Sequence, residues 1–445
     1  MRLSGAARGL NRTMMAAPQQ PQQEASVNAL ISSISQKAPA SPSLARSLSL
    51  VQATLYGLGV TIGAGIYVLI GAAAARAGMH APLAFVIAAS LMALSAASFA
   101  ELACRYPVAA GEAAYAREAF RSNWIATTVG LLVIGIALVS AAAISIGSAG
   151  YLSVFVTLPA PVVVTAVVVA MGMIAAWGVR QSVSFAGIMT LIEIGGLLLL
   201  IVAGAAFDGP IVARLPEVIP AFNPAVLAGL VGTVLLAVFA FIGFEGLANV
   251  AEEVRQPNKT LPRAIFLTLA ISTLLYVCVV WIALIAVGPS ELARSQAPLA
   301  LVFERLTGAS PRTMSAIAVI ATLNGIIVQI IMASRVLYGL ARLGDLPAPL
   351  ARVSGRTHTP LVATALATFV VLVLALALPL HDLAELTSRL TLVVFTIVNI
   401  SLIVIKARPT SLVTEGYEAP RWVPWAGAGT CLLLLALDAW ILMLG

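Results

Sequence analysis

The chain has 445 residues, of which 60% are hydrophobic and 10% are charged, and its mean hydropathy is +1.02. A soluble chain would carry about 25% charged residues, so this composition excludes a water-soluble globular protein. The net charge of +7 comes from basic residues spread through short segments, a pattern that does not indicate nucleic-acid binding.

The apolar residues fall in long continuous runs that begin near residue 48. Residues 1–45 are rich in Gln, Ala, Ser and Pro, which predicts a disordered tail; an organelle transit peptide is the less favoured alternative. A transmembrane barrel is excluded, because its strands would alternate polar and apolar residues. Since a helix needs about 20 apolar residues to cross a bilayer, we predict eleven transmembrane helices, over 48–73, 82–104, 124–152, 160–178, 184–206, 225–250, 264–288, 313–338, 360–380, 384–405 and 424–444.

The basic residues predict the orientation of these helices. With the N-terminus in the cytoplasm, 19 of the 25 Lys and Arg residues fall in inside segments and 5 in outside segments, while Arg389 lies within a span. The positive-inside rule therefore favours a cytoplasmic N-terminus, and eleven spans then place the C-terminus outside.

The sequence carries no motif of an enzyme or a metal site. The three cysteines, Cys104, Cys278 and Cys431, stand at scattered spacing and predict neither a disulfide framework nor a metal site. No HExxH or GxSxG motif is present, and the three histidines lie far apart in the sequence. We therefore expect no enzyme, no cofactor and no metal.

The first predicted helix is interrupted at its middle by "VTIGAGIYVLIG", residues 60–71. Gly63 and Gly65 flank Ala64 there, and glycine inside a helix costs roughly 0.5–1 kcal/mol relative to alanine. Tight helix packing through the GxxxG spacing of Gly59 and Gly63 is one interpretation. The other is a broken helix, whose freed amide N–H groups would form an anion site suited to a carboxylate.

The sixth predicted helix has a matching interruption in "FAFIGFEG", residues 239–246. Glycine-interrupted segments at corresponding places in two halves indicate a transporter binding site. The first and sixth helices correspond if helices 1–5 and 6–10 form an inverted repeat. We therefore predict an all-α membrane protein of five-plus-five fold, with one repeat over 46–207, the second over 224–405, and a loop plus an eleventh helix over 406–445.

Four stretches in this order resemble the amino acid–polyamine–organocation superfamily of permeases. They are "TIGAGIYVL" (61–69), "AELACRYPVAAGEAAYAREAF" (100–120), "FAFIGFEGLANVAEEVRQPNKTLPRAI" (239–265) and "SRVLYGLARLGDLPAPLARVSGRTHTP" (334–360). The first and third are especially close to bacterial and cationic amino acid permeases. Most members have twelve helices, whereas we predict eleven here. Because the last helices of relatives often lie in dimer contacts, a homodimer is possible but not fixed by the resemblance.

The resemblance implies a substrate site at the two interruptions. Amides around Gly63, Ala64, Gly65 and Ile66 would hold the carboxylate of an amino acid. Its ammonium would lie against the carbonyl groups of Thr61, Ile62, Phe239, Ala240 and Ile242. Phe241, or its neighbour Phe239, would form an aromatic lid. Gln329 falls where related transporters contact the substrate side chain. Asn324, five residues before it, is a second polar residue in the same apolar helix; helix–helix hydrogen bonds are the alternative for both.

Two acidic residues within the predicted spans are candidates for ion coupling. An ionised carboxylate at Glu193 would destabilise the membrane-spanning helix by several kcal/mol unless it is paired or protonated. Glu193 would carry a coupled proton, or hold a cation with carbonyls near Thr61 and the hydroxyl of Ser334; a static buried pair is the alternative. Glu245 follows the sixth-helix interruption, where it would gate the site or relay a proton, or simply accept hydrogen bonds from freed amides.

Other charged residues have structural alternatives. Arg389 would face a vestibule or pair with Glu385, and we expect Asp438 to serve packing or an oligomer contact. A set on the cytoplasmic side would form an inner gate of salt bridges or merely a solvated surface: Glu101, Arg105, Glu112, Arg117, Glu252, Glu253 and Arg255.

The function expected from these features is secondary active transport of an amino acid or related amine across a bacterial inner membrane, with H⁺ as the coupling ion. Exchange or uniport without an ion is the alternative, and a sensor that keeps the site without transport is less favoured. Apolar residues at the interruptions favour a neutral or apolar substrate, whereas the resemblance to cationic permeases favours a basic one.

Overall fold

The computed structural model describes residues 48–63, 65–107, 111–178, 183–207, 209, 211–408 and 416–444. The chain divides into two units, 1–45 and 46–445, and the described residues belong to the second. Within them the regular structure is helical, apart from one isolated bridge that joins Leu48 to Val254.

The helices account for the eleven predicted spans. Within the described residues, nine stretches are long and apolar enough to cross a membrane, one of which, Ile66–Arg105, joins two helices, and Leu50–Ile62 and Leu361–Ala377 are shorter apolar helices. The spans are α2 (Leu50–Ile62) with α3 (Ile66–Ala77), α4 (Ala81–Arg105), α6 (Asn123–Leu152), α7 (Ala160–Trp177), α8 (Val183–Ala205), α9 (Pro224–Phe241) with α10 (Gly246–Asn249), α11 (Pro257–Ala286), α14 (Arg312–Arg342), α15 (Leu361–Ala377), α16 (Leu380–Lys406) and α17 (Trp422–Leu444).

Local sequence signals fix several helix ends. Ser49 and Gln52 form a capping box at the start of α2, in which each side chain accepts from the other residue's main chain. The side chain of Asn223 caps α9 by accepting from the amide of Ala225. Gly178 ends α7 in the left-handed conformation that glycine adopts without strain.

The seventh span begins earlier than the sequence predicts. Helix α11 starts at Pro257 rather than at 264 and continues through Pro262. A proline inside a helix frees the carbonyl group four residues earlier. Here that carbonyl, on Asn258, accepts the thiol of Cys104 at 3.4 Å. A tertiary contact therefore satisfies the group that the proline leaves unpaired.

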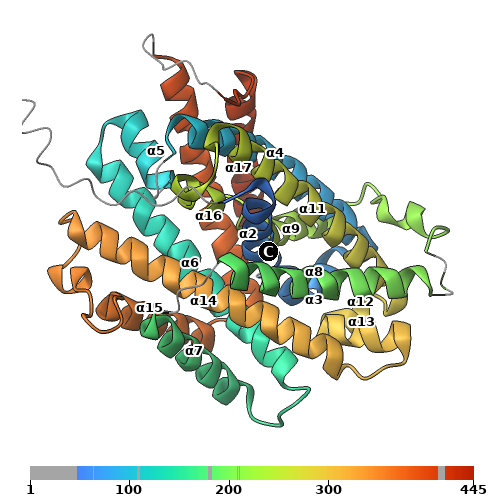
Figure 1. Cartoon of the computed structure of the whole chain (residues 1–445). Helices are drawn as coiled ribbons and strands as arrows, with labels where there is room; N and C mark the ends of the chain where they lie inside the picture. The colour runs from blue at the N-terminus through green and yellow to red at the C-terminus, as the bar shows by residue number, and fades with distance from the viewer. Residues whose placement is uncertain are drawn as a thin grey trace, which may run out of the picture. The chain divides into compact units, whose positions relative to one another are not determined.

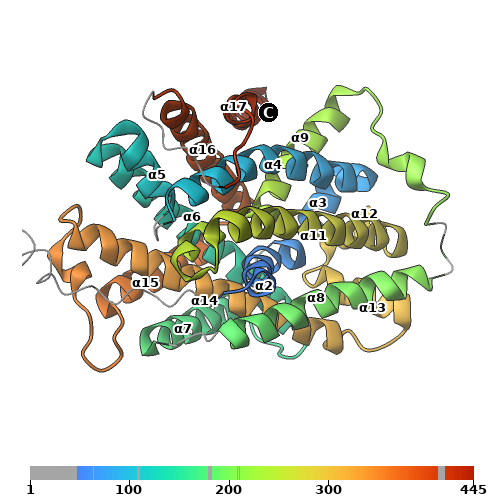
Figure 2. The same ribbon diagram turned by 45° about the horizontal axis from the view of Figure 1, so that its top comes forward.

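The broken first span lies inside the bundle. Helices α8 and α11 pack against α2, and α9 packs against α3 (Figures 1 and 2). Helix α14 runs alongside α6, and α16 packs against α6 and α17. Short helices complete the bundle: α5 (Gly111–Phe120) packs against α6 and α16, α12 (Pro289–Arg294) against α3, and α13 (Pro298–Thr307) against α14 and α8.

Candidate functional site

The first interruption is a break between two half-helices. Helix α2 ends at Ile62, and α3 begins at Ile66 with Gly65 as its N-cap. Ala64, the predicted centre of the carboxylate loop, lies outside the described residues. Because the first amides of a helix lack partners within it, the start of α3 presents main-chain donors in the middle of the bundle.

The second interruption is a break between α9 and α10. Ile242 leaves the helix in an extended conformation, and Gly243 follows at φ +135°, a conformation that side-chain-bearing residues rarely adopt. The carboxylate of Glu245 accepts the amide N–H of Gly243 at 2.8 Å. The hydrogen bond that we predicted as the structural alternative for Glu245 is therefore present.

The two breaks touch each other. A Cβ placed on Gly65 would lie 2.2 Å from the Cα of Ala240, and one on Gly243 would lie 2.7 Å from the amide nitrogen of Thr61. Only glycine allows this approach of the half-helices. The hydroxyl of Tyr276 in α11 joins them further, because it donates to the carbonyl of Thr61 at 2.9 Å and to that of Ala240 at 3.1 Å.

The sequence analysis missed Tyr276. It is fully buried. A tyrosine hydroxyl inside an apolar helix usually needs a hydrogen-bond partner, and this was the one sign in the sequence that Tyr276 binds another segment. A carbonyl oxygen has two lone pairs. Thr61 and Ala240, both predicted to hold the substrate ammonium, therefore keep one acceptor site each beside this hydroxyl.

Glu193 lies against the first break. It is fully buried, and its Oε1 accepts from Nδ2 of Asn324 at 3.1 Å and lies 3.3 Å from the Cβ position of Gly63. Within the described residues, its Oε2 has no hydrogen-bond partner. Tyr67 of α3 donates its hydroxyl to the main-chain oxygen of Glu193 at 2.7 Å. The structure thus brings Glu193, Asn324 and the first break together without an ion pair in the described part of the chain.

The other two predicted residues of α14 differ in their surroundings. Gln329 is 3% exposed, and its Oε1 has no hydrogen-bond partner in the part of the chain that the structure describes. Ser334 is also buried, but its hydroxyl donates to the carbonyl of Ile331 within α14 at 2.9 Å. Gln329 therefore has an unused polar atom, whereas the hydroxyl of Ser334 is engaged by its own helix.

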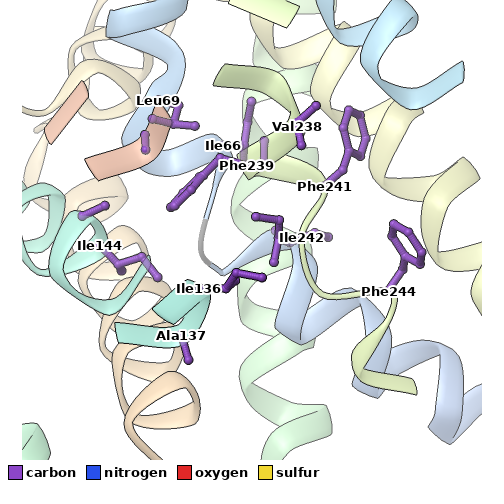
Figure 3. Close-up of a cluster of buried hydrophobic side chains, with 14 of the residues drawn as sticks. Ile66, Leu69, Ile136, Ala137, Ile144, Val238, Phe239, Phe241, Ile242 and Phe244 are labelled. Carbon is purple, nitrogen blue, oxygen red and sulfur yellow. The ribbon is translucent and has the colours of Figure 1, made fainter. Parts of the chain in front are cut away.

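One side of the second break is apolar. Figure 3 shows Phe239 beside Ile66, with side chains of α6 across from them. The sequence analysis did not single out α6, because apolar residues in an apolar helix carry no local sign of a site. The buried residues that share this region are Ile66, Ile136, Ala137, Ile144, Phe239 and Ile242.

The aromatic residues of the break point in different directions. Phe241 turns away from α6 (Figure 3) and packs its ring on Phe85 and Tyr276, with centroid distances of 6.3 and 5.3 Å. Of the two aromatic residues predicted for the lid, only Phe239 lies on the side of Ile66 and α6.

A cavity of about 600 Å³ lies along α3. Its lining from this helix runs from Tyr67, the second residue of α3, to Arg76 in the last turn. Gly147 and Gly150 of the facing helix α6 also line it. The cavity therefore follows α3 over most of its length.

Ion pairs lie at the end of this cavity. Arg76 pairs with Glu385, which also binds Arg389 at 2.8 Å, and Arg389 binds Asp438 of α17 at 2.6 Å. We call these four residues the Glu385 network. The predicted pairing of Arg389 with Glu385 is present, and Asp438 is part of the same network.

A second network lies at the C-terminal ends of α4 and α16. Glu101 is fully buried and binds Arg105 and Lys406, each at 2.7 Å, and also accepts the amide N–H of Ala419 at 2.8 Å. We call Glu101, Arg105 and Lys406 the Glu101 network. The predicted set on this side is therefore divided, because Glu101 and Arg105 are held in this network while Arg117 and Arg255 are exposed. In the described part of the chain, no group of three or more His, Cys, Asp or Glu side chains is arranged to hold a metal ion.

Comparison with known proteins shows that the chain is similar to transporters. A sequence model of the amino acid permease family matches residues 48–444. A branched-chain amino acid permease of Bacillus subtilis is 28% identical, over 90% of this chain and 89% of its own. A methylthioribose transporter of the same organism is 27% identical over 88% of each chain. Cationic amino acid transporter 2 of Arabidopsis thaliana, a vacuolar protein, is 29% identical over 82% of this chain and 60% of its own.

Proposed function

The chain belongs to the amino acid permease family and is an integral membrane protein, and on this basis we propose that it carries an amino acid across a bacterial inner membrane by alternating access, in symport with H⁺. The N-terminus would lie in the cytoplasm, as the distribution of basic residues favours. Two broken helices that touch at the centre of the bundle support transport, since such breaks place polar main-chain atoms at a substrate site.

The main chain of the breaks would bind the two charged groups of the substrate. The amides that begin α3 at Ile66 would hold the carboxylate, since the N-terminus of a helix attracts an anion. The carbonyls of Thr61 and Ala240 would hold the ammonium, oriented by the hydroxyl of Tyr276 that already binds both. An α-amino acid carries both groups on one carbon atom and fits this arrangement.

Glu193 would carry the coupled proton. Its carboxyl lies at the first break with a neutral amide as its hydrogen-bond partner and with Oε2 unused. A carboxylate in such a place costs several kcal/mol, so the protonated form suits the closed site. Water that enters when the site opens would let the proton leave. This location, beside the substrate loop and without a cation in the described residues, is the observation that carries the proposal of coupling.

The substrate would have an apolar side chain. Ile66, Phe239 and Ile242 with their neighbours from α6 form the apolar region around the breaks (Figure 3), and burial of a branched aliphatic side chain there would stabilise the complex by roughly 1.5–3 kcal/mol. The unused amide oxygen of Gln329 would sit at its polar edge. The branched-chain permease of Bacillus subtilis is consistent with this choice.

Uptake into proteoliposomes tests the proposal. Radiolabelled leucine, valine, lysine and glutamate would be offered with and without an inward H⁺ gradient, to wild type, Glu193→Gln and the exposed control Glu304→Gln. We expect gradient-driven accumulation of leucine or valine by wild type and Glu304→Gln. In Glu193→Gln the accumulation should be lost while leucine binding persists.

Two outcomes would support other functions. Uptake that ignores the gradient, or that requires an amino acid inside the vesicles, would indicate uniport or exchange, and Glu193 would then be a structural partner of Asn324. Binding without any flux would indicate a sensor.

A further inference from the structure

The first turn of the short helix α5 lies against α10, the segment that follows the second break. The amide N–H of Gly111 donates to Oδ1 of Asn249 in α10 at 3.3 Å. Ring packing extends this contact, because Phe99 of α4 lies between Tyr115 and Phe244, with centroid distances of 6.4 and 6.0 Å. The first turn of α5 therefore covers the segment that follows the break.

The other end of α5 is fixed more firmly. Arg408, just after α16, donates to the main-chain oxygens of Glu118 and Ala119 and also pairs with the carboxylate of Glu118 at 3.4 Å. Three contacts of a guanidinium hold the last turn of α5, whereas in the described residues one long hydrogen bond, from a main-chain amide to a side-chain oxygen, joins its first turn to α10. If the helix moves, its first turn is the end that leaves.

Two carboxyl groups lie on either side of this contact. Glu112 follows Gly111 in the first turn of α5 and is 5% exposed, and the partly buried Glu245 is the N-cap of α10, the helix that carries Asn249. The hydroxyl of Tyr115 nearby is buried and has no hydrogen-bond partner within the described residues. In those residues no ion pair is formed by either carboxyl group.

The charged groups of the surrounding helices are already bound. On α4, Arg105 binds Glu101, and Lys406 of α16 binds the same carboxylate. Cys104 of α4 donates its thiol to a carbonyl of α11. Helix α6 carries no titratable side chain before Tyr151, at its other end. Within the described residues, the cations of the helices packed on this end of α5 are therefore bound to Glu101, and neither Glu112 nor Glu245 forms an ion pair.

We propose that α5 is a latch whose first turn stays on the second break while Glu112 or Glu245 holds a proton and leaves when both are ionised. Two buried carboxylates in one region without a cation repel each other, whereas protonation of one removes this repulsion and the cost of burying its charge. Departure of the first turn would uncover the break from the side of the membrane that carries α5. The inference goes beyond the proposed transport and does not require Glu193 to carry a proton.

The titration of Glu112 gives the direction of this response. Burial raises the pKa of Glu112 from its ordinary value of 4.5 to about 7. On the released helix the side chain is solvated and its pKa returns toward 4.5. Docking is therefore strongest below pH 4.5, weakens as the pH rises to about 7, and changes little above that.

The distance between α5 and α11 tests the latch. Nitroxide labels would be placed at Ala114→Cys and Lys259→Cys in the full chain, with the three native cysteines replaced by serine and the protein in lipid nanodiscs. Double electron–electron resonance spectroscopy would measure the distance between the two labels at pH 5 and pH 8. We expect one short distance at pH 5 and an additional longer one at pH 8. In Glu112→Gln only the short distance should remain at both pH values.

Matched variants decide the interpretation. Glu118→Gln changes an exposed carboxylate on the same helix but keeps the two main-chain oxygens that bind Arg408, so it should respond to pH like wild type. Glu245→Gln removes the other carboxyl and should also suppress the longer distance, which keeps the test decisive if Glu112→Gln does not fold. A single distance at both pH values in wild type, or a longer distance that persists in both Gln variants, would overturn the latch. Because the measurement involves no flux, its result is independent of whether uptake assays show transport.

Discussion

The contact between the two breaks can be tested with one methyl group. In Gly65→Ala the new Cβ would lie 2.2 Å from the Cα of Ala240, a separation that real Cβ atoms essentially never show. Because the obstructing atom belongs to the main chain, it cannot rotate away, and α3 and α9 have to part. Overpacking of this kind costs about 1–3 kcal/mol, and alanine recovers nothing in return, because Gly65 is the N-cap of α3 and the penalty of glycine applies to helix interiors. We expect a loss of about 1–3 kcal/mol in the free energy of unfolding.

Thermal unfolding of the purified protein, with and without saturating substrate, measures this loss. We expect a lower melting temperature and no stabilisation by substrate in Gly65→Ala. The control Gly246→Ala adds a methyl group near the second break where no atom lies within 4 Å, and should behave like wild type. Adding Ala240→Gly to Gly65→Ala removes the side-chain contact at 2.7 Å but leaves the Cα, so it should not restore stability. If Gly65→Ala matched Gly246→Ala in both melting and transport, the half-helices would not meet as described.

Three further substitutions have expected outcomes. Tyr276→Phe removes the donor to one carbonyl group of each break and should lower the free energy of unfolding by about 1–3 kcal/mol, measured by thermal melting. Lys406→Met removes one of the two cations of the fully buried Glu101, which keeps Arg105, and should cost about 1.5–3 kcal/mol, seen as a lower melting temperature; melting at the wild-type temperature would contradict this. Asp438→Asn leaves Arg389 paired with Glu385 and should cost only about 1 kcal/mol, with uptake retained.

The broken helices could be predicted because their cause is local. Glycine inside an apolar run is expensive wherever the rest of the chain lies, so Gly63, Gly65 and Gly243 mark the breaks without knowledge of the fold. The same reasoning applies to Glu193, since a carboxylate within a span requires a partner or a function at any depth. Its partner Asn324 was recognisable as polar, but the pairing of the two became visible only in the structure.

Features that depend on two distant segments could not be predicted. The two carbonyl groups that Tyr276 binds belong to helices that approach each other only in the folded bundle. Ile136 and Ile144 look like any other apolar residues of a spanning helix until α6 is placed across from the breaks (Figure 3). The thiol of Cys104 that binds the carbonyl group freed by Pro262 belongs to α4, more than 150 residues earlier in the chain, so this contact within the early part of α11 also appears only in the fold.

The partners of the charged groups indicate which parts of the bundle are fixed. The Glu385 network ties α16 to α3 and α17, and the Glu101 network ties α16 to α4. Separating such a pair leaves an uncompensated charge in a medium of low dielectric constant, which is strongly unfavourable. Helix α16 is therefore held at both of its ends.

The carboxyl groups at the breaks are different, because main-chain or side-chain amides are their only hydrogen-bond donors in the described residues. A protonated carboxyl can exchange one neutral partner for another without separating charge, so the breaks can rearrange at a smaller electrostatic cost than either end of α16. The amino acid substrate fits this division, since it brings a carboxylate and an ammonium together and adds no net charge. In the mechanism that we propose, a proton on Glu193 would be the charge that moves with the substrate, and for this reason we place the coupling site beside the first break rather than in either ion-pair network.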